Sequence, residues 1–502
     1  MPRMHRRIFR YRIFFVIAIP TLYLLCTNLA TILFPGYVPS SEISSANPRL
    51  RRLLQFEEDI ALHAKNETNN CTAPAIREFP PDGLTREQRQ SGYISIHFVI
   101  AIYLFLLLAI VCDDFFVPSI KKICEHMNVT EDVAGATVMA AASSSPELFI
   151  NVVGTFVTEG DLGVGTIVGS AVFNVLAVPA CCGIFATQVL QLEWWPVTRD
   201  TLAYAFTVLL LILTLRDGRV EWYEALLLVG FYLLYISAMC FNRRIGGFFT
   251  AKRRKYKNFC EESPLIPNKS LKDMDMHFFE SSEEDESLDI VNMTSWPSTT
   301  CERIWWVVTW PINFVLLITI PDCRRPKLKS WYPVTFFMCI VWIAGTSYVV
   351  GWVITVIGDT FMIPDSIMGL TFLAAGMSVP EAVSSVIVTN QGHGTMGISN
   401  SIGSNVFDVL LCLGLPWFVK AAFLPSVDGH HYVKINSQGL VYSSVSLFST
   451  LVALYASLAV AKFKLTRSVA IVCLIMYVIF LVFASVVELN TFFVVNLPIC
   501  DH

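Results

Sequence analysis

Residues 137–149 read T-V-M-A-A-A-S-S-S-P-E-L-F, and residues 169–174 end the same stretch with G-S-A-V-F-N. This stretch places the carboxylate of Glu147 inside a run that is apolar enough to lie in a membrane. A charged side chain in hydrocarbon is costly unless another group or an ion pairs with it. Glu147 therefore predicts a functional site, and the stretch predicts a membrane protein.

The same pattern returns 234 residues later, as T-F-L-A-A-G-M-S-V-P-E-A-V from residue 371 and G-S-N-V-F-D from residue 403. The polar and proline positions that correspond without a gap are Thr137 and Thr371, Ser144 and Ser378, Pro146 and Pro380, Glu147 and Glu381, Ser170 and Ser404, and Asn174 and Asp408. A repeat of two interrupted apolar segments is typical of a secondary transporter that binds ions near the middle of the membrane. One glutamate alone could have a structural, hydrogen-bonding role, but a second copy in register disfavours that interpretation.

The composition agrees with an all-α polytopic membrane protein. Of the 502 residues, 54% are hydrophobic and 15% are charged, and many apolar runs reach about 20 residues, the length that crosses a bilayer. We expect the lipid bilayer and small inorganic cations as partners, no nucleic acid, no cofactor and no enzymatic activity. Most of the 14 cysteines lie in apolar segments, where cysteine behaves as a small hydrophobic residue. A disulfide between Cys71 and Cys500 is one possibility on the oxidising side.

The first 93 residues predict a membrane-targeting segment followed by an exposed one. Residues 1–33 join an arginine-rich start to an apolar run, as in a signal peptide or an uncleaved signal anchor. Residues 34–93 are polar and are expected in the lumen or outside the cell. Asn66 and Asn70 begin sequons there and are candidate glycosylation sites.

Ten core transmembrane helices are expected in two groups of five. The first repeat, residues 94–241, contains spans at about 94–117, 132–157, 163–187, 199–215 and 221–241, and the second, residues 331–488, contains spans at about 331–357, 367–389, 397–420, 439–461 and 468–488. An odd number of spans reverses the direction of the second copy, so the two form inverted repeats. Residues 489–502 are then a lumenal or extracellular tail.

Residues 242–330 are predicted to be a cytosolic linker. A basic run follows residue 242, and an acidic run, residues 280–289, comes later; basic residues beside a span favour the cytosol. The linker is either a solvated tether or a site of serine phosphorylation. Within it, residues 304–320 are apolar but have basic residues on both sides, so we expect an interfacial or re-entrant element and no crossing.

The repeated motifs suggest oxygen ligands for hard cations. Pro146 and Pro380 lack an N–H group and should break or kink their helices, which frees backbone carbonyls. Small or hydroxylated residues surround both prolines, and their oxygens suit Na⁺, K⁺ and Ca²⁺. The candidate neutral ligands are Ser143, Ser144, Ser378, Thr137, Thr371, Ser170 and Ser404.

Asn174 and Asp408 each follow the glutamate of their repeat by 27 residues. Equal spacing in inverted repeats should bring Glu147, Glu381, Asn174 and Asp408 to one level near the pseudo-two-fold axis. Three carboxylates in a dry site must hold cations or protons. The empty protein should therefore resist the change of access from one face to the other, and this makes transport an exchange.

At these residues the sequence resembles the cation/calcium exchanger superfamily, and most closely the potassium-dependent sodium/calcium exchangers. The segments D-V-A-G-A-T-V-M-A-A-A-S-S-S-P-E-L and M-G-L-T-F-L-A-A-G-M-S-V-P-E-A-V are similar to the two repeats of that family, and the likeness extends over nearly all of residues 90–490. The resemblance implies that Glu147 and Glu381 are the central Ca²⁺ and Na⁺ ligands. It implies that Ser143, Ser144 and Ser378 add oxygens and that Asp408 confers dependence on K⁺.

Four positions depart from the pattern of the family: Ala142 and Ser145 replace a usual Gly and Ala, Met377 replaces a usual Thr, and Glu381 stands where this branch usually has Asp. These departures bear on ion preference more than on the type of transport. The alternatives are a proton-coupled or potassium-independent cation/Ca²⁺ exchanger and, from another class, a channel or signalling protein. The plasma membrane and a Golgi or lysosome-related membrane fit equally well, and the sequence does not specify the oligomeric state.

Overall fold

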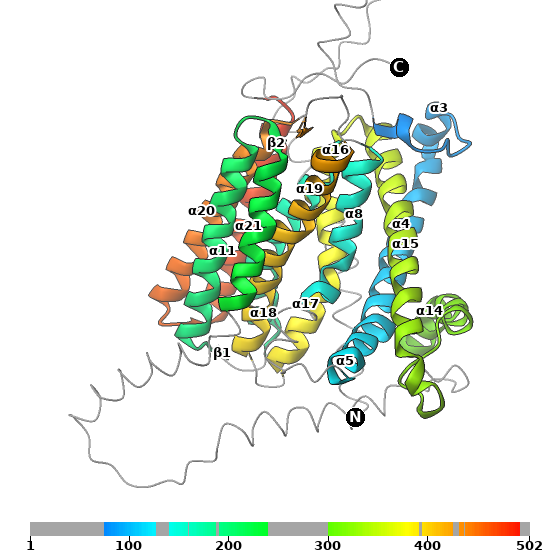
Figure 1. Cartoon of the computed structure of the whole chain (residues 1–502), viewed down its shortest axis with the longest axis horizontal. Helices are drawn as coiled ribbons and strands as arrows, with labels where there is room; N and C mark the ends of the chain where they lie inside the picture. Colours follow the sequence, from blue (N-terminus) through cyan, green and yellow to red (C-terminus); the bar gives the residue numbers. More distant parts are fainter. Residues whose placement is uncertain are drawn as a thin grey trace, which may run out of the picture. The chain divides into compact units, whose positions relative to one another are not determined.

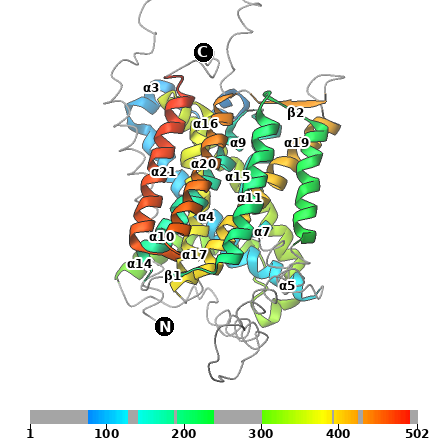
Figure 2. The ribbon, with the colours of Figure 1, turned by 90° about the vertical axis from the view of Figure 1, so that its left-hand side faces the viewer.

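The computed structural model describes residues 75–126, 140–158, 160–186, 190–238, 300–390, 394–424, 431–435 and 437–491. This part of the chain is almost entirely helical (Figures 1 and 2). It contains 8 helices that are long and apolar enough to cross a membrane. The chain is therefore a multi-pass membrane protein, as the composition predicted.

The described residues divide into two compact units, of which the larger comprises residues up to 103, 147–228 and from 348 onward. Its main helical elements, in chain order, are α8 (Ser145–Phe156, counted from Glu147), α9 (Leu162–Val172), η5 (Phe173–Ala177), α10 (Val178–Phe185), α11 (Trp194–Leu215), α16 (Asp365–Met368), η7 (Gly369–Leu373), α17 (Ala374–Asn390), α18 (Gly394–Phe407), η8 (Asp408–Leu413), α19 (Gly414–Phe423), α20 (Gly439–Val460) and α21 (Arg467–Glu488). η5, η7 and η8 are turns of π-helix.

Two short strand pairs define the two ends of the larger unit. β1 (Leu190–Gln191) pairs with β4 (Lys464–Leu465), and β2 (Arg219–Glu221) pairs with β3 (Tyr432–Lys434). α11 leads from β1 to β2, whereas α20 leads from β3 to β4. These two helices, which pack against each other, therefore run in opposite directions.

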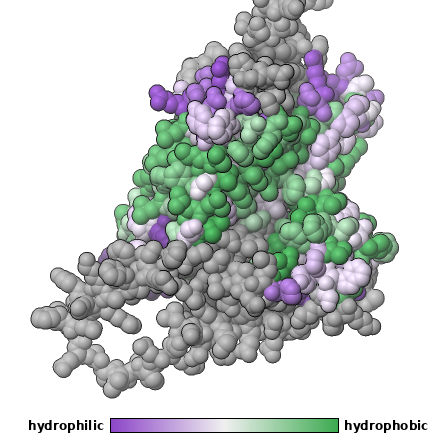
Figure 3. Space-filling view, in the orientation of Figure 1, coloured by the Kyte–Doolittle hydropathy of each residue, from purple (hydrophilic) through white to green (hydrophobic). Residues whose placement is uncertain are grey.

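The helices of the larger unit are hydrophobic on their outer faces, as expected for contact with lipid. On α11, Leu202 is 66% exposed and Leu213 is 62% exposed, and on α20 Val445 is 50% exposed. Figure 3 shows hydrophobic side chains over this part of the surface. The polar residues of α11 that are buried, such as Asp200 and Tyr204, lie on the other side of the helix.

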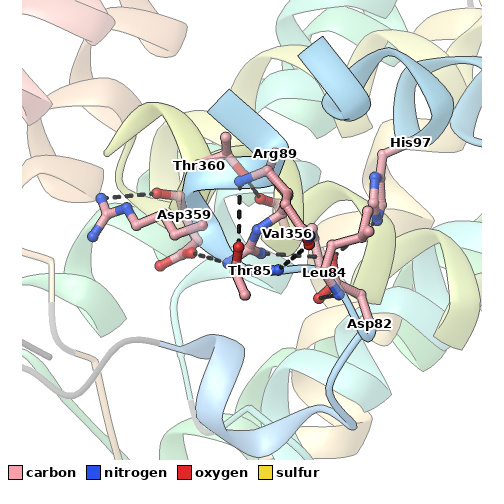
Figure 4. A network of polar contacts seen from close by, with 10 residues as sticks. Asp82, Leu84, Thr85, Arg89, His97, Val356, Asp359 and Thr360 are labelled. Atoms are coloured by element: carbon pink, nitrogen blue, oxygen red, sulfur yellow. Dashed lines mark hydrogen bonds and ion pairs between the residues drawn. The ribbon is translucent and has the colours of Figure 1, made fainter. Parts of the chain in front are cut away.

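A buried ionic network joins the segment before α4 to the end of α15 (Tyr332–Phe361) within the larger unit (Figure 4). Arg89 Nη2 lies 3.2 Å from Asp359 Oδ2, and Arg89 Nη1 lies 3.8 Å from Asp82 Oδ2. His97 Nε2 lies 3.4 Å from the same Asp82 oxygen. Since Arg89 and His97 are 7% and 6% exposed, the network holds η2 (Arg89–Tyr93) and the start of α4 (Ile94–Ile110) against residue 359.

The smaller unit comprises residues 104–146 and 229–347. It contains η3 (Val111–Phe116), α5 (Val117–His126), α7 (Ala140–Ser143), α14 (Thr300–Thr319) and η6 (Pro326–Trp331), with parts of α4 and α15 and the end of the helix Trp222–Ala238. Arg324 Nε bonds Asp322 Oδ1 at 3.1 Å, and its guanidinium lies 4.0 Å from Asp114. The basic stretch before α15 is therefore packed against η3, and Asp114 has a structural ion pair.

The described helices overlap the predicted spans, but 8 of them are long and apolar enough to cross a membrane, whereas ten core spans were expected. α14 forms over the interfacial or re-entrant element expected at residues 304–320, with Pro311 inside it, and it is not among the 8 helices that are long and apolar enough to cross a membrane. The helix is interrupted at Ser144, next to Pro146, whereas α17 continues through Pro380. Of the break or kink expected at Pro380, a break is therefore excluded. A proline removes only one backbone hydrogen bond, and the wide π-helical turn η7 already adjusts the backbone upstream.

Several predictions lie outside the described residues. These are the signal segment at 1–33, most of the segment at 34–93 with Asn66, Asn70 and Cys71, residue Thr137, most of the linker, and nearly all of the tail with Cys500. They stay predictions.

Candidate functional site

Four predicted polar residues lie buried in the middle of the larger unit. Glu147 stands in the first turn of α8 and is 2% exposed, and Glu381 stands in α17 and is 8% exposed. Asn174 lies in η5 and Asp408 opens η8, and each is 1% exposed. Three carboxylates are thus removed from solvent, and each belongs to a different helical segment.

Asn174 is the link between the two repeats at this site. Its Nδ2 donates to Glu381 Oε2 at 2.5 Å and to Asn405 Oδ1 at 3.1 Å. Its backbone carbonyl accepts from Ser401 Oγ at 2.9 Å. The first repeat therefore contributes a neutral amide directly to the carboxylate of the second.

The Glu147 carboxylate lies within electrostatic reach of both Asp408 and Glu381. Neighbouring negative charges repel each other strongly in a dry interior, where no water screens them. Cations or protons must balance them in any stable state. In the part of the chain that the structure describes, no three His, Cys, Asp or Glu side chains converge closely enough to hold one metal ion. An ion bound here must therefore complete its shell with neutral oxygens.

Such oxygens are present around the carboxylates. Asn174 Oδ1 and Ser378 Oγ are buried and have no hydrogen-bond partner among the described residues. A buried polar atom without a partner is costly and is often satisfied by an ion or a water molecule. The chemistry of these donors fits hard cations such as Na⁺, K⁺ and Ca²⁺.

The other predicted hydroxyls are found in two situations. Ser170, Ser404 and Thr371 are buried and donate to carbonyls of their own helices, and each keeps its oxygen lone pairs. Ser143 and the fully buried Ser144 lie in the smaller unit, beside the helix interruption. Thr137 lies outside the described residues.

Glycine brings the two repeats into backbone contact beside the site. A Cβ on Gly169 would lie 2.2 Å from the carbonyl oxygen of Leu370, and one on Gly369 would lie 2.5 Å from that of Leu162. These distances are far below van der Waals contact, so only glycine fits. The close approach of α9 to η7 positions Asn174 next to α17.

A π-helical turn stands at the same place in each repeat. η5 begins at Phe173 and η8 begins at Asp408, both at the end of the G-S-x-V-F motif. Such turns widen the helix, disturb the regular backbone hydrogen bonds and occur frequently at functional sites. The Cys412 carbonyl in η8 accepts from Asn151 Nδ2 at 2.6 Å. Asn151 lies one turn after Glu147, so α8 is fixed to the helix that carries Asp408.

Asn405 and Ser401 were not among the site residues predicted from the sequence. The repeat could have indicated both, because Asn405 corresponds to Ala171 and Ser401 corresponds to Ile167 at the same offset. A polar residue in one copy, opposite an apolar residue in the other, marks a place where the two halves differ in chemistry.

The chain is similar to known ion exchangers. The family model described as "Sodium/calcium exchanger protein" matches residues 97–241 and 331–486. Sodium/potassium/calcium exchanger 4 of Homo sapiens is 37% identical over 546 residues, which cover 86% of this chain and 87% of that protein. Sodium/potassium/calcium exchanger 5 of Homo sapiens is also 37% identical, over 82% of this chain and 87% of that protein. A solved structure of the sodium-calcium exchanger NCX_Mj is 19% identical, with a TM-score of 0.43, over 76% of this chain and 97% of that chain.

Proposed function

Since the chain belongs to the sodium/calcium exchanger family, we propose that it is a potassium-dependent sodium/calcium antiporter, which exchanges Na⁺ for Ca²⁺ together with K⁺ by alternating access. It is a transporter and not an enzyme, like the exchangers that it matches. The observation that supports the proposal is the burial of three carboxylates, Glu147, Glu381 and Asp408, in the larger unit, where Asn174 Oδ1 and Ser378 Oγ are buried without a hydrogen-bond partner.

Charge balance explains why such a site exchanges ions. One Ca²⁺ and one K⁺ carry three positive charges, which match the three carboxylates. Without ions, the carboxylates would have to pass a dry barrier when access changes from one face to the other, and this is costly. Only the loaded protein changes its access readily, so the movement of one set of ions depends on the return of another.

The proposed ligands are Glu147, Glu381, Asp408, Asn174, Ser378 and Asn405, with Ser143, Ser144, Thr371, Ser170 and Ser404 close to them in sequence or on the same helices. The carboxylates of Glu147 and Glu381 suit Ca²⁺ or Na⁺, which compete for the same oxygens. Asp408, at the start of η8, is the proposed determinant of K⁺ dependence.

We also propose that residues 94–241 and 331–488 are inverted repeats joined by a cytosolic linker at 242–330. The opposite directions of α11 and α20 between the two strand pairs support this arrangement. Cysteine labelling of residues at the ends of α11 and α20, in intact cells and in permeabilised cells, tests it. Fluorescent tagging distinguishes the plasma membrane from a Golgi or lysosome-related membrane.

The decisive test is ion flux in vesicles that contain the purified protein. A Na⁺ gradient should drive Ca²⁺ uptake in the opposite direction, and removal of K⁺ should reduce the uptake at least tenfold. Equal flux with and without K⁺ would favour a potassium-independent exchanger. Uptake that is driven by a pH gradient in the absence of Na⁺ would favour a proton-coupled exchanger, and flux that needs no counter-ion would indicate a channel.

A further inference from the structure

Tyr204 is a buried polar residue that the repeated motifs do not include. It lies in the middle of α11 and is 0% exposed. Its hydroxyl group is buried and has no hydrogen-bond partner among the described residues. A phenol usually finds a partner when it is buried, and a ligand bound in front of the Tyr204 hydroxyl would satisfy it.

The neighbours of Tyr204 indicate which ligand this is. α11 packs against α18 and against η8, the turn that Asp408 opens. Asp408 is the carboxylate within electrostatic reach of the Tyr204 phenol. A cation held between the two would receive one negative charge and one neutral oxygen from them, which suits a monovalent ion better than a divalent one.

The corresponding helix of the other repeat makes the contrast clear. The buried positions Val197, Tyr204 and Leu211 of α11 correspond to Leu440, Leu447 and Leu454 of α20, at a constant offset of 243 residues. α20 packs against α9 and η5, as α11 packs against α18 and η8.

The two repeats therefore differ together at two positions. Where the second repeat has the carboxylate Asp408, the helix packed against it offers the phenol of Tyr204. Where the first repeat has the neutral Asn174, the equivalent helix offers the apolar Leu447. The phenol oxygen of Tyr204 therefore lies on the helix packed against the segment of Asp408, whereas the helix packed against the segment of Asn174 has no such oxygen at the equivalent position.

We propose that Tyr204 is a further residue of the ion site and that its hydroxyl oxygen is a neutral ligand of the K⁺ held at Asp408. This inference rests on the proposed function, and it adds a ligand from α11, a helix outside the repeated motifs. The phenol would raise the affinity for K⁺ without adding charge to a cluster that already holds three carboxylates.

The test measures Na⁺-driven Ca²⁺ uptake into vesicles as a function of K⁺ concentration, for the wild-type protein and for Tyr204→Phe. The variant lacks only the oxygen. Its half-saturating K⁺ concentration should rise roughly tenfold, with uptake at saturating K⁺ close to wild type, because one ligand of a hydrated ion is lost. Tyr442→Phe is the control, since Tyr442 lies on α20, the equivalent helix, and is 46% exposed.

A second comparison separates ligation of K⁺ from a structural role. In the Asp408→Asn background, Tyr204→Phe should leave Ca²⁺ uptake unchanged, because the K⁺ that Tyr204 contacts is no longer held. An unchanged half-saturating K⁺ concentration in the single variant would overturn the proposal, and so would an equal loss of uptake in both backgrounds. If Tyr204→Phe does not reach the membrane, Tyr204→Leu, which copies Leu447, replaces it in the same assays. Failure of the proposed function is a different result, because wild-type uptake would then not respond to K⁺ at all.

Discussion

The two repeats share their glutamates and serines but differ in how each glutamate helix is held. In α8, Asn151 donates to the Cys412 carbonyl at 2.6 Å, and one turn later the Thr155 carbonyl accepts from Lys420 Nζ at 2.6 Å. Both contacts join the glutamate helix of the first repeat to η8 and α19 of the second. Lys420 is 6% exposed, so a cation is buried at the end of α8.

The equivalent positions around α17 are less polar. Ser385, which corresponds to Asn151, donates to the Gly397 carbonyl at 3.3 Å, and Ala186 stands where α19 has Lys420. The lysine also lies near the C-terminal end of α8, where a positive charge is favourable. These contacts couple α8 and the segment of Asp408 more firmly than their counterparts are coupled, so ion binding at Asp408 should affect both glutamates.

The largest expected effect comes from the glutamates that the repeats share. Glu147→Gln and Glu381→Gln should each reduce the rate of Na⁺-driven Ca²⁺ uptake by more than roughly 100-fold, because each removes a charge that the ions balance. Vesicle flux measures the loss, and gel filtration shows whether the variants still fold. Wild-type uptake by one variant would show that the repeats are not equivalent even here.

Making the two repeats alike at Asp408 and Asn174 should change the dependence of uptake on K⁺. Asp408→Asn, which copies Asn174, should preserve Ca²⁺ uptake while reducing its activation by K⁺ at least tenfold, because the charge that holds K⁺ is lost. Uptake is measured with and without K⁺. The matched change, Asn174→Asp, adds a fourth carboxylate and should reduce uptake at every K⁺ concentration; if K⁺ activation survives Asp408→Asn, this assignment is wrong.

A smaller effect is expected at Asn405, which the first repeat replaces with Ala171. Asn405→Ala removes the acceptor of the bond from Asn174 Nδ2 at 3.1 Å. One hydrogen bond is worth about 1 kcal/mol, so the apparent affinity for Ca²⁺ should fall about fivefold. Ca²⁺ titration of uptake tests this, and a change confined to the maximal rate would contradict it.

The smallest effect on transport is expected at Lys420. Lys420→Met keeps the unbranched apolar stem of the side chain but leaves the Thr155 carbonyl without its bond, at a cost of about 1.5–3 kcal/mol in the free energy of unfolding. Thermal unfolding in detergent should occur at a lower temperature, while the half-saturating K⁺ concentration stays unchanged. Lys434→Met, at an exposed position of β3, is the control and should be neutral. A shifted K⁺ requirement would show that Lys420 acts on the ions directly.

Much of the architecture could be read from the sequence because hydrophobic length and exact repetition act locally. Runs of about 20 apolar residues predict spans, and the observed bounds of α11, α20 and α21 agree with those predictions. The equal spacing from Glu147 to Asn174 and from Glu381 to Asp408 predicted that these residues come together. All four are buried in the larger unit, and Asn174 bonds Glu381.

The expected effect of the prolines shows the limit of local reasoning. Pro146 and Pro380 occupy identical positions in the motif, yet the helix is interrupted only beside the first. A proline removes a hydrogen bond in either place, but the surrounding packing determines whether the helix is interrupted.

The amino-acid sequence alone was therefore enough to predict the class of protein, the positions of the helices and the charged residues of the site, since each follows from the cost of placing polar groups in hydrocarbon. The three-dimensional structure was needed to find that Asn174 bonds Glu381, that Asn405 joins them, that Lys420 caps α8 and that Tyr204 lies near Asp408. These contacts connect residues that are 204 to 265 positions apart. They form because backbones brought together at glycines such as Gly169 let distant side chains meet. No local pattern encodes such a meeting, because it depends on the packing of all the helices at once.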